Sequence, residues 1–210
     1  MITETKRKLA LDLLEIGAIK FGAFKLKLHD TMPDAPLSPV YIDLRILRSF
    51  PKLMDTLTKV YQELTSGLKF DVYADVPTAA TPLVAVLSYK TGIPMISPRK
   101  DEKSHGIRRQ IDGVFKQGQV ALLVDDLITQ AESKLETISI LEENGIKVLD
   151  VAVLVDREQG GAKQLESRGY ACHAAFKLRE LLKLYLDLQR ITPEKYGQVI
   201  SYLEGNKKEA

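Results

Sequence analysis

The stretch VALLVDDLITQAESK, Val120 to Lys134, decides the fold. It begins with five apolar residues in a row, which need cover on both faces, whereas a half-solvated strand would alternate. The apolar run stops at two adjacent carboxylates, Asp125 and Asp126, and a polar turn then leads into a helix. This order is typical of a buried parallel strand that delivers acidic groups to a ligand crevice. An alternative is that the two aspartates cap the helix that follows.

The chain on both sides of this stretch alternates apolar strands with amphipathic helices. We expect strands over residues 71–74, 93–96, 147–156 and 171–176, with helices between them. Such alternation predicts an α/β fold with a doubly wound, mostly parallel sheet, in which ligands bind outside the carboxyl ends of the strands. That rule gathers on one rim the charged residues that follow the strands, which are Asp75, Arg99, Asp125, Asp126 and Arg157.

Length and composition predict a single domain. A chain of 210 residues with 45% hydrophobic content can bury one sizeable core. Residues 1–45 are expected to form an N-terminal helix and a small hood, and residues 46–210 the core. Within the hood, residues 21–28 alternate as in a half-exposed strand, so Lys27 is either a solvated charge or a contact for an anion.

Charge and cysteine content exclude several classes of protein. The net charge of +2 indicates neither a nucleic-acid partner nor a disordered acidic tail. The single cysteine, Cys172, cannot form an intrachain disulfide and fits a reducing compartment. No run approaches the roughly 20 apolar residues of a membrane span, and the N-terminal residues are charged throughout. We therefore expect a cytoplasmic protein with no membrane partner.

One segment, PRKDEKSHGIRR, is unlike the rest of the chain. It spans residues 98–109 and is rich in basic residues, with Ile107 as its large apolar residue. Such a segment is expected to be a mobile loop. It is either a solvated hairpin or a loop whose Arg99, Lys100 and Lys103 close over an anionic substrate.

Paired carboxylates together with several cations suit a sugar polyphosphate bound with Mg²⁺. Hard cations and hydroxyl groups prefer carboxylate oxygen, whereas phosphates prefer guanidinium and ammonium groups. The chain also resembles the orotate phosphoribosyltransferase family of type I phosphoribosyltransferases. The resemblance covers nearly the whole chain in order, through the strings LEIGAIKFGAFKLK, SPVYIDLR, PRKDEKSHG, VALLVDDLIT and VLVDREQGG.

The resemblance implies an activity. Ribose 5-phosphate would pass from phosphoribosyl pyrophosphate to a nitrogen of orotate, giving orotidine 5'-monophosphate in de novo pyrimidine biosynthesis. Mg²⁺ would be the cofactor, and the enzyme would be a homodimer. Because the transition state is oxocarbenium-like, catalysis would come mainly from electrostatics and loop closure.

The resemblance also implies roles for the residues at the rim. Asp125 and Asp126 would hold the ribose hydroxyls, with Mg²⁺ nearby and bound through the substrate. The turn from Thr129 to Ser133 would wrap the 5'-phosphate with backbone N–H groups. Arg157 would face the carboxylate of orotate.

The remaining roles belong to the loop and to the hood. Arg99, Lys100, Lys103 and His105 would reach the diphosphate, some of them in the neighbouring subunit's site. Lys103 would neutralise the charge on the departing pyrophosphate. Lys27 would lie beside orotate, together with Thr129 and Arg157.

Three ligand loops depart from the family pattern. Glu132 stands in the phosphate turn, where small residues are usual, and Asp75 stands in the diphosphate loop, where glycine is usual. Residues 28–37 form a proline-bearing extension after Lys27. The two acids favour an alternative, a catalytically impaired member that acts as a nucleotide-binding or regulatory module. The extension favours another, a phosphoribosyltransferase for a different base.

Overall fold

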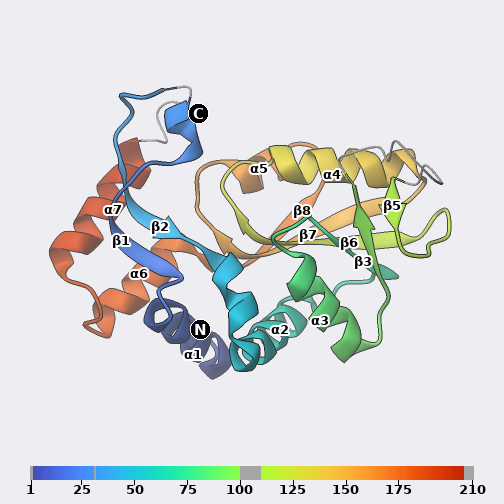
Figure 1. Ribbon diagram of the computed structural model, residues 1–210, viewed down its shortest axis with the longest axis horizontal. Helices are drawn as coiled ribbons and strands as arrows, with labels where there is room; N and C mark the ends of the chain where they lie inside the picture. The colour runs from blue at the N-terminus through green and yellow to red at the C-terminus, as the bar shows by residue number, and fades with distance from the viewer. Residues whose placement is uncertain (1, 31, 100–109, 206–210) are drawn as a thin grey trace.

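The computed structural model describes residues 2–30, 32–99 and 110–205 of the chain. These residues form one large sheet with helices on both faces, and a small second sheet beside it (Figure 1). The strands of the large sheet lie in the order β5-β4-β3-β6-β7-β8. All of its neighbouring strands pair in parallel except β5, which is antiparallel to β4. The strand bounds are β3 Val72–Asp75, β4 Met95–Pro98, β5 Ile111–Asp112, β6 Val120–Ile128, β7 Lys147–Asp156 and β8 Ala171–Lys177.

Helices cover both faces of the large sheet. In Figure 1, α4 and α5 lie over one face, and α2 and α3 lie over the other. Their bounds are α2 Pro51–Thr65, α3 Thr81–Thr91, α4 Glu132–Glu143 and α5 Gly161–Glu166. The expected α/β fold with a doubly wound, mostly parallel sheet is therefore confirmed. Within the described part of the chain, no helix combines the length and apolarity that crossing a membrane requires.

The hood is the antiparallel sheet β1–β2, with α1, α6 and α7 beside it (Figure 1). Two short 3-10 helices, η1 and η2, follow its strands. The bounds are α1 Glu4–Glu15, β1 Ile19–Phe24, η1 Lys27–Asp30, β2 Ser38–Ile42, η2 Leu44–Ser49, α6 Leu178–Asp187 and α7 Pro193–Gly205. The division of the chain at residue 45 stays a prediction.

Both strands of the hood are short, and the first ends before the expected residue 28. β1 ends at Phe24 after a shift of register against β2, so Lys27 begins η1 instead of lying on a strand. β2 ends at Ile42, because the side chain of Asp43 accepts a hydrogen bond from the backbone N–H of Arg45 and starts η2. Local capping thus overrides an alternating pattern.

The central strand β6 is longer than expected. It does not end before the two aspartates, because its ladder with β7 continues to Ile128. Side chains alternate between the faces of a sheet. Val124 packs in the core under α2 and α3, and Leu123 packs in the core under α4. Asp125 therefore faces α4, whereas Asp126 faces the α2 and α3 layer.

Candidate active site

Asp125, at the carboxyl end of β6, is closed off by the protein. It is 4% exposed, and its Oδ2 lies 2.5 Å from the Nζ of Lys134 in the first turn of α4. Its Oδ1 accepts a hydrogen bond from the backbone N–H of Asp126 at 2.8 Å. The Lys134 ammonium also donates to the backbone oxygen of Leu127 at 2.7 Å. Both carboxylate oxygens of Asp125 are therefore engaged.

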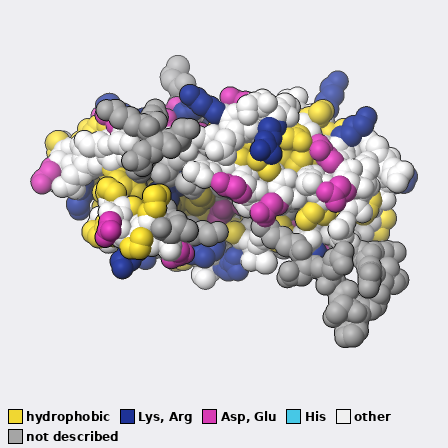
Figure 2. All heavy atoms as spheres, turned by 90° about the horizontal axis from the view of Figure 1, so that it is seen from above, with side chains coloured by type: hydrophobic (Ala, Val, Ile, Leu, Met, Phe, Trp, Pro, Cys, Tyr) yellow, Lys and Arg dark blue, Asp and Glu magenta, His cyan; other side chains and the backbone are white. Residues whose placement is uncertain are grey.

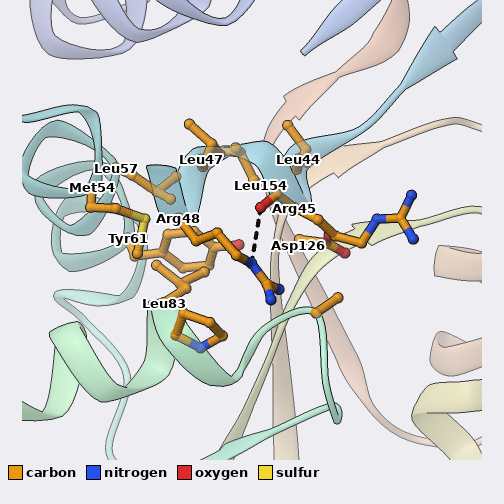
Figure 3. Close-up of a pocket in the computed structure, with 12 residues that line it drawn as sticks. Leu44, Arg45, Leu47, Arg48, Met54, Leu57, Tyr61, Leu83, Asp126 and Leu154 are labelled. Atoms are coloured by element: carbon orange, nitrogen blue, oxygen red, sulfur yellow. Dashed lines mark hydrogen bonds between the residues drawn. The ribbon is translucent and has the colours of Figure 1, made fainter. Parts of the chain in front are cut away.

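Asp126 faces the other side of the sheet, where it lines a cavity with residues of η2, α2 and α3 (Figure 3). Its Oδ1 accepts a hydrogen bond from the backbone N–H of Leu127 at 2.7 Å. Burial raises the pKa of Asp126 to about 7, and the neighbouring Asp125 carboxylate adds to the shift. The side chain of Asp126 therefore changes charge near neutral pH.

The cavity beside Asp126 combines apolar walls with two arginines. The Nε of Arg48 donates to the backbone oxygen of Arg45 at 3.0 Å, as the dashed line in Figure 3 shows. The Arg45 guanidinium points away from the apolar wall, and its Nε lies 2.8 Å from a carboxylate oxygen of Asp43. The apolar lining consists of Leu44, Leu47, Met54, Leu57, Ala79, Pro82, Leu83 and Leu154. The polar lining consists of the two arginines, Tyr61 and Asp126.

The turn from Thr129 to Ser133 leads from β6 into α4. The helix begins at Glu132 after its N-cap Ala131, and no side chain caps it. Because the first N–H groups of a helix have no partner within the helix, they can bind an anion here. The N–H of Ala131 is already engaged, since it donates to the Oε1 of Gln164 at 3.0 Å. Binding of a 5'-phosphate by this turn stays a prediction.

Gly161 holds the ends of β6 and β7 together. Its N–H donates to the backbone oxygen of Thr129 at 3.1 Å. A Cβ at this position would lie 2.6 Å from the Cγ1 of Ile128, a contact that real side chains essentially never make. Glycine is therefore required for the loop after β7 to approach the phosphate turn so closely.

Arg157 follows β7 as a buried cation. It is 6% exposed, and no described residue forms a hydrogen bond with its Nε or Nη2. Burial lowers the pKa of Arg157. A buried charge is costly unless a partner compensates it. An anionic ligand such as a carboxylate would supply that partner.

The basic loop is described only at its two ends. Arg99 forms an ion pair with Asp112 of β5, and its backbone N–H donates to the oxygen of Gln110 at 2.8 Å. Lys100, Lys103 and His105 lie outside the described residues, so their expected roles stay predictions. Lys27 is placed only by its backbone, at the start of η1.

The two acids that depart from the family pattern lie in different environments, one buried and one exposed. Asp75 is fully buried, and the hydroxyl of Thr81 at the start of α3 donates to its Oδ2. Its Oδ1 has no hydrogen-bond partner among the described residues. Glu132 is exposed at the first position of α4. Neither acid provides an observation that favours the impaired alternative.

The donor groups fit a metal ion that arrives with a substrate. Among the described residues, no group of three or more His, Cys, Asp or Glu side chains could hold a metal ion. Mg²⁺ is commonly bound by one or two carboxylates together with substrate phosphates. The carboxylate of Asp126 is half-buried and lies beside a cavity. It therefore fits a Mg²⁺ ion that is bound mainly by the substrate, rather than one that is enclosed by protein ligands.

Charges on the surface above α4 and α5 are mixed. Figure 2 shows basic and acidic side chains interspersed over this face, rather than gathered by sign. Mixed charge does not create the strong field that attracts nucleic acid. The expectation of no nucleic-acid partner stays a prediction.

Three residues around the site were missed by sequence reasoning. Gln164 binds the phosphate turn, Lys134 binds Asp125, and the Tyr61 hydroxyl donates to the backbone oxygen of Asp125 at 2.5 Å. Lys134 could have been found, because it lies four residues before Ile138 on the buried face of α4. A lysine at an apolar helical position indicates a buried partner. The contacts of Tyr61 and Gln164 left no such signal.

The chain is similar in sequence to orotate phosphoribosyltransferases and to uridine 5'-monophosphate synthases. The chain is 37% identical to an orotate phosphoribosyltransferase of Pyrobaculum aerophilum over 193 residues, which cover 91% of this chain and 95% of that protein. It is 33% identical to the uridine 5'-monophosphate synthase of Bos taurus over 200 residues, which cover 94% of this chain and 40% of that protein. No protein-family model matches the chain.

A solved structure agrees with these relatives. The structure of Leishmania donovani UMP synthase superposes with a TM-score of 0.84 and 32% identity, covering 95% of this chain and 42% of that one. The chain spans about two fifths of the length of the longer relatives, which include the bifunctional enzyme PyrF/PyrE of Nostoc, 38% of which is covered.

Proposed function

The chain belongs to the orotate phosphoribosyltransferase family, and on that basis we propose that it transfers ribose 5-phosphate from phosphoribosyl pyrophosphate to a nitrogen of orotate. The products are orotidine 5'-monophosphate and pyrophosphate. The observation that carries the proposal is the buried guanidinium of Arg157, whose Nε and Nη2 lack partners among the described residues. The carboxylate of orotate is the anion that this cation lacks.

The neighbouring groups fit the rest of the substrate. The uncapped start of α4 offers backbone N–H groups to the 5'-phosphate. The acidic end of β6 offers carboxylate oxygen to the ribose hydroxyls. Positive charge that develops on the ribose in an oxocarbenium-like transition state is stabilised by the same carboxylate. Because these groups are held in place by the sheet, little reorganisation is needed during the reaction.

Three further features belong to the proposal. Asp126 would lie beside a Mg²⁺ ion that arrives with the substrate diphosphate, and that ion would supply positive charge to the leaving pyrophosphate. Two chains form a dimer, and the segment with Lys103 serves the partner's site. The reaction takes place in the cytoplasm, where the single thiol of Cys172 stays reduced.

The test is formation of orotidine 5'-monophosphate by the pure full chain. Orotate, phosphoribosyl pyrophosphate and Mg²⁺ are supplied, the product is separated by chromatography, and Lys103→Ala serves as the control. Turnover above the control supports the proposal, and turnover no greater than the control would overturn it. A panel of other bases distinguishes orotate from the alternative of a different substrate.

The dimer has its own test. Light scattering gives the mass of the particle in solution, and mixing Lys103→Ala with Arg157→Met tests whether two damaged chains complement one another. If the loop acts in the partner's site, one of the two sites in a mixed dimer is intact and activity returns. A monomeric mass, or no recovery on mixing, contradicts this part of the proposal.

A further inference from the structure

The residue that the proposed reaction leaves without a role is Lys134. Its side chain is 6% exposed, as is that of Asp125, and the two form a buried ion pair. The ammonium also donates to the backbone oxygen of Leu127. Lys134 therefore bridges the residues on either side of Asp126 in the chain.

We infer that Lys134 is a positioning residue of the ribose site, which keeps Asp125 on the α4 side of the sheet and leaves Asp126 as the carboxylate that meets the ribose hydroxyls. The inference rests on the proposed function for the identity of the ligand. It refines that function, because it separates two adjacent aspartates into a holding residue and a binding residue.

Asp125 has little capacity left for a ligand. Its Oδ1 accepts from the N–H of Asp126, its Oδ2 accepts from Lys134, and its backbone oxygen accepts from the hydroxyl of Tyr61. Turning Asp125 toward a ligand would leave the Lys134 ammonium buried without its counter-charge. Removing one partner of a buried pair is strongly unfavourable, and one hydrogen bond to a hydroxyl is too weak to compensate.

Asp126 has the opposite properties. It is half-buried and lines the cavity between η2, α2 and α3 (Figure 3). Its Oδ1 accepts a hydrogen bond from the N–H of Leu127. No ion pair with a described residue holds its carboxylate, so the group can still accept a hydrogen bond from a ribose hydroxyl. The backbone that carries Asp126 is held by three hydrogen bonds. The N–H of Asp126 donates to Asp125, the N–H of Leu127 donates to Asp126, and Lys134 donates to the backbone oxygen of Leu127.

Binding of ribose 5-phosphate and of inorganic phosphate to the full chain, measured by calorimetry, tests the inference without any turnover. The ratio of the two dissociation constants isolates the contribution of the ribose, because both ligands use the same amides of the phosphate turn. A change in Lys134 that only loosened α4 or altered the local charge would weaken both ligands in proportion and leave the ratio unchanged. A change that acts through the ribose site alters the ratio.

The expected changes in this ratio differ among variants. Asp126→Asn reduces the preference for ribose 5-phosphate about 10- to 100-fold, as loss of a hydrogen bond to a charged group requires. Lys134→Met reduces it about tenfold, because the released Asp125 carboxylate disturbs Asp126. In an Asp125→Asn background, Lys134→Met adds less than about a threefold change, since its effect acts through Asp125. Lys163→Met, an exposed lysine on α5, serves as the matched control and leaves the ratio unchanged.

Three outcomes overturn the inference. The first is a Lys134→Met variant whose ratio equals that of the wild type. The second is an Asp125→Asn variant that loses as much preference for ribose 5-phosphate as Asp126→Asn does, and the third is a wild-type chain with no such preference. If Lys134→Met does not fold, the neutral pair Asp125→Asn/Lys134→Met is compared with Asp126→Asn in its place, and an equal loss overturns the inference. A wild-type chain that binds ribose 5-phosphate but gives no turnover contradicts the proposed function alone.

Discussion

The ends of β6 and β7 carry neighbouring charged residues, Asp125 and Asp126 on β6 and Asp156 to Glu158 on β7, whose contacts with the protein differ from one residue to the next. On β6, Asp125 is held by Lys134, whereas Asp126 faces a cavity. On β7, the Oδ1 of Asp156 accepts a hydrogen bond from the N–H of Glu158 at 2.7 Å, whereas Arg157 has unpaired nitrogens. Adjacent charges at a strand end therefore have different tasks, because neighbouring side chains project in different directions.

Burial shifts the pKa values of the charged residues at both strand ends. Burial raises the pKa of Asp156 and of Asp126 and lowers the pKa of Arg157. In all three cases desolvation disfavours the charged form. A ligand that brings the opposite charge, or hydroxyl donors, offsets this cost. A ligand of this kind, with an anion beside β7 and hydroxyls beside β6, is the one that the proposed function supplies.

The largest effect is expected from Arg157→Met. If the free nitrogens of Arg157 bind the orotate carboxylate, the substitution lowers kcat/KM for orotate about 100-fold or more. The KM for phosphoribosyl pyrophosphate should change much less, because the phosphate turn is untouched. Steady-state kinetics with each substrate varied in turn measures both values. The exposed Arg168→Met is the control, and an equal loss there would break the comparison.

The contact that joins the two strand ends is tested by Gly161→Ala. The new methyl group would lie 2.6 Å from the Cγ1 of Ile128, so either the turn or the strand must shift. We expect a loss of about 1–3 kcal/mol in the free energy of unfolding, as overpacking typically causes. Gly197→Ala in α7 meets no atom within 4 Å and is the matched control. Chemical denaturation of both variants measures the difference, and equal stabilities would contradict the close contact.

The pH dependence of the reaction tests Asp126. Its pKa of about 7 means that the carboxylate is lost as the pH falls below neutrality, so kcat/KM for phosphoribosyl pyrophosphate should fall about tenfold per pH unit there. Asp126→Asn should lack this acidic limb. If kcat/KM of Asp126→Asn falls at acidic pH as much as that of the wild type, the titrating group is another residue.

Stability has the opposite pH dependence through the same group. Since the pKa of Asp126 is raised from an ordinary 3.8 to about 7, the folded state keeps a proton that the unfolded state releases between these values. The stability from this group is complete below pH 3.8 and is lost as the pH rises through 7. The melting temperature of Asp126→Asn relative to wild type should therefore increase across this range. A constant difference would contradict the raised pKa.

The smallest effect is expected from Tyr61→Phe. The hydroxyl donates to the backbone oxygen of Asp125 and is buried, so its removal leaves that oxygen without this donor. The expected cost is about 1 kcal/mol in the free energy of unfolding, with the ring packing retained. Thermal denaturation measures it. Tyr89→Phe, on an exposed ring, should leave the free energy of unfolding unchanged. A similar loss in both variants would show that the hydrogen bond of Tyr61 does not contribute to stability.

Much of the fold could be predicted from local sequence signals. The strand over residues 147–156 was expected at its observed bounds, and the helices were expected between the strands, where the structure has them. Each depends on an apolar pattern and on a terminating residue that act over a short range. The hood was predicted less well, because its elements end at a register shift and at a side-chain cap. Such contacts depend on residues that periodicity does not describe.

The candidate site, too, was partly predictable from the sequence. By itself the sequence determined that charged residues, among them Asp125, Asp126 and Arg157, follow apolar strands and meet at one rim, because the order of strands and helices dictates a parallel sheet. Only the tertiary structure decided which of them are engaged and which are free. That choice depends on Lys134 and on the faces of β6, since burial and ion pairing arise between residues that folding brings together.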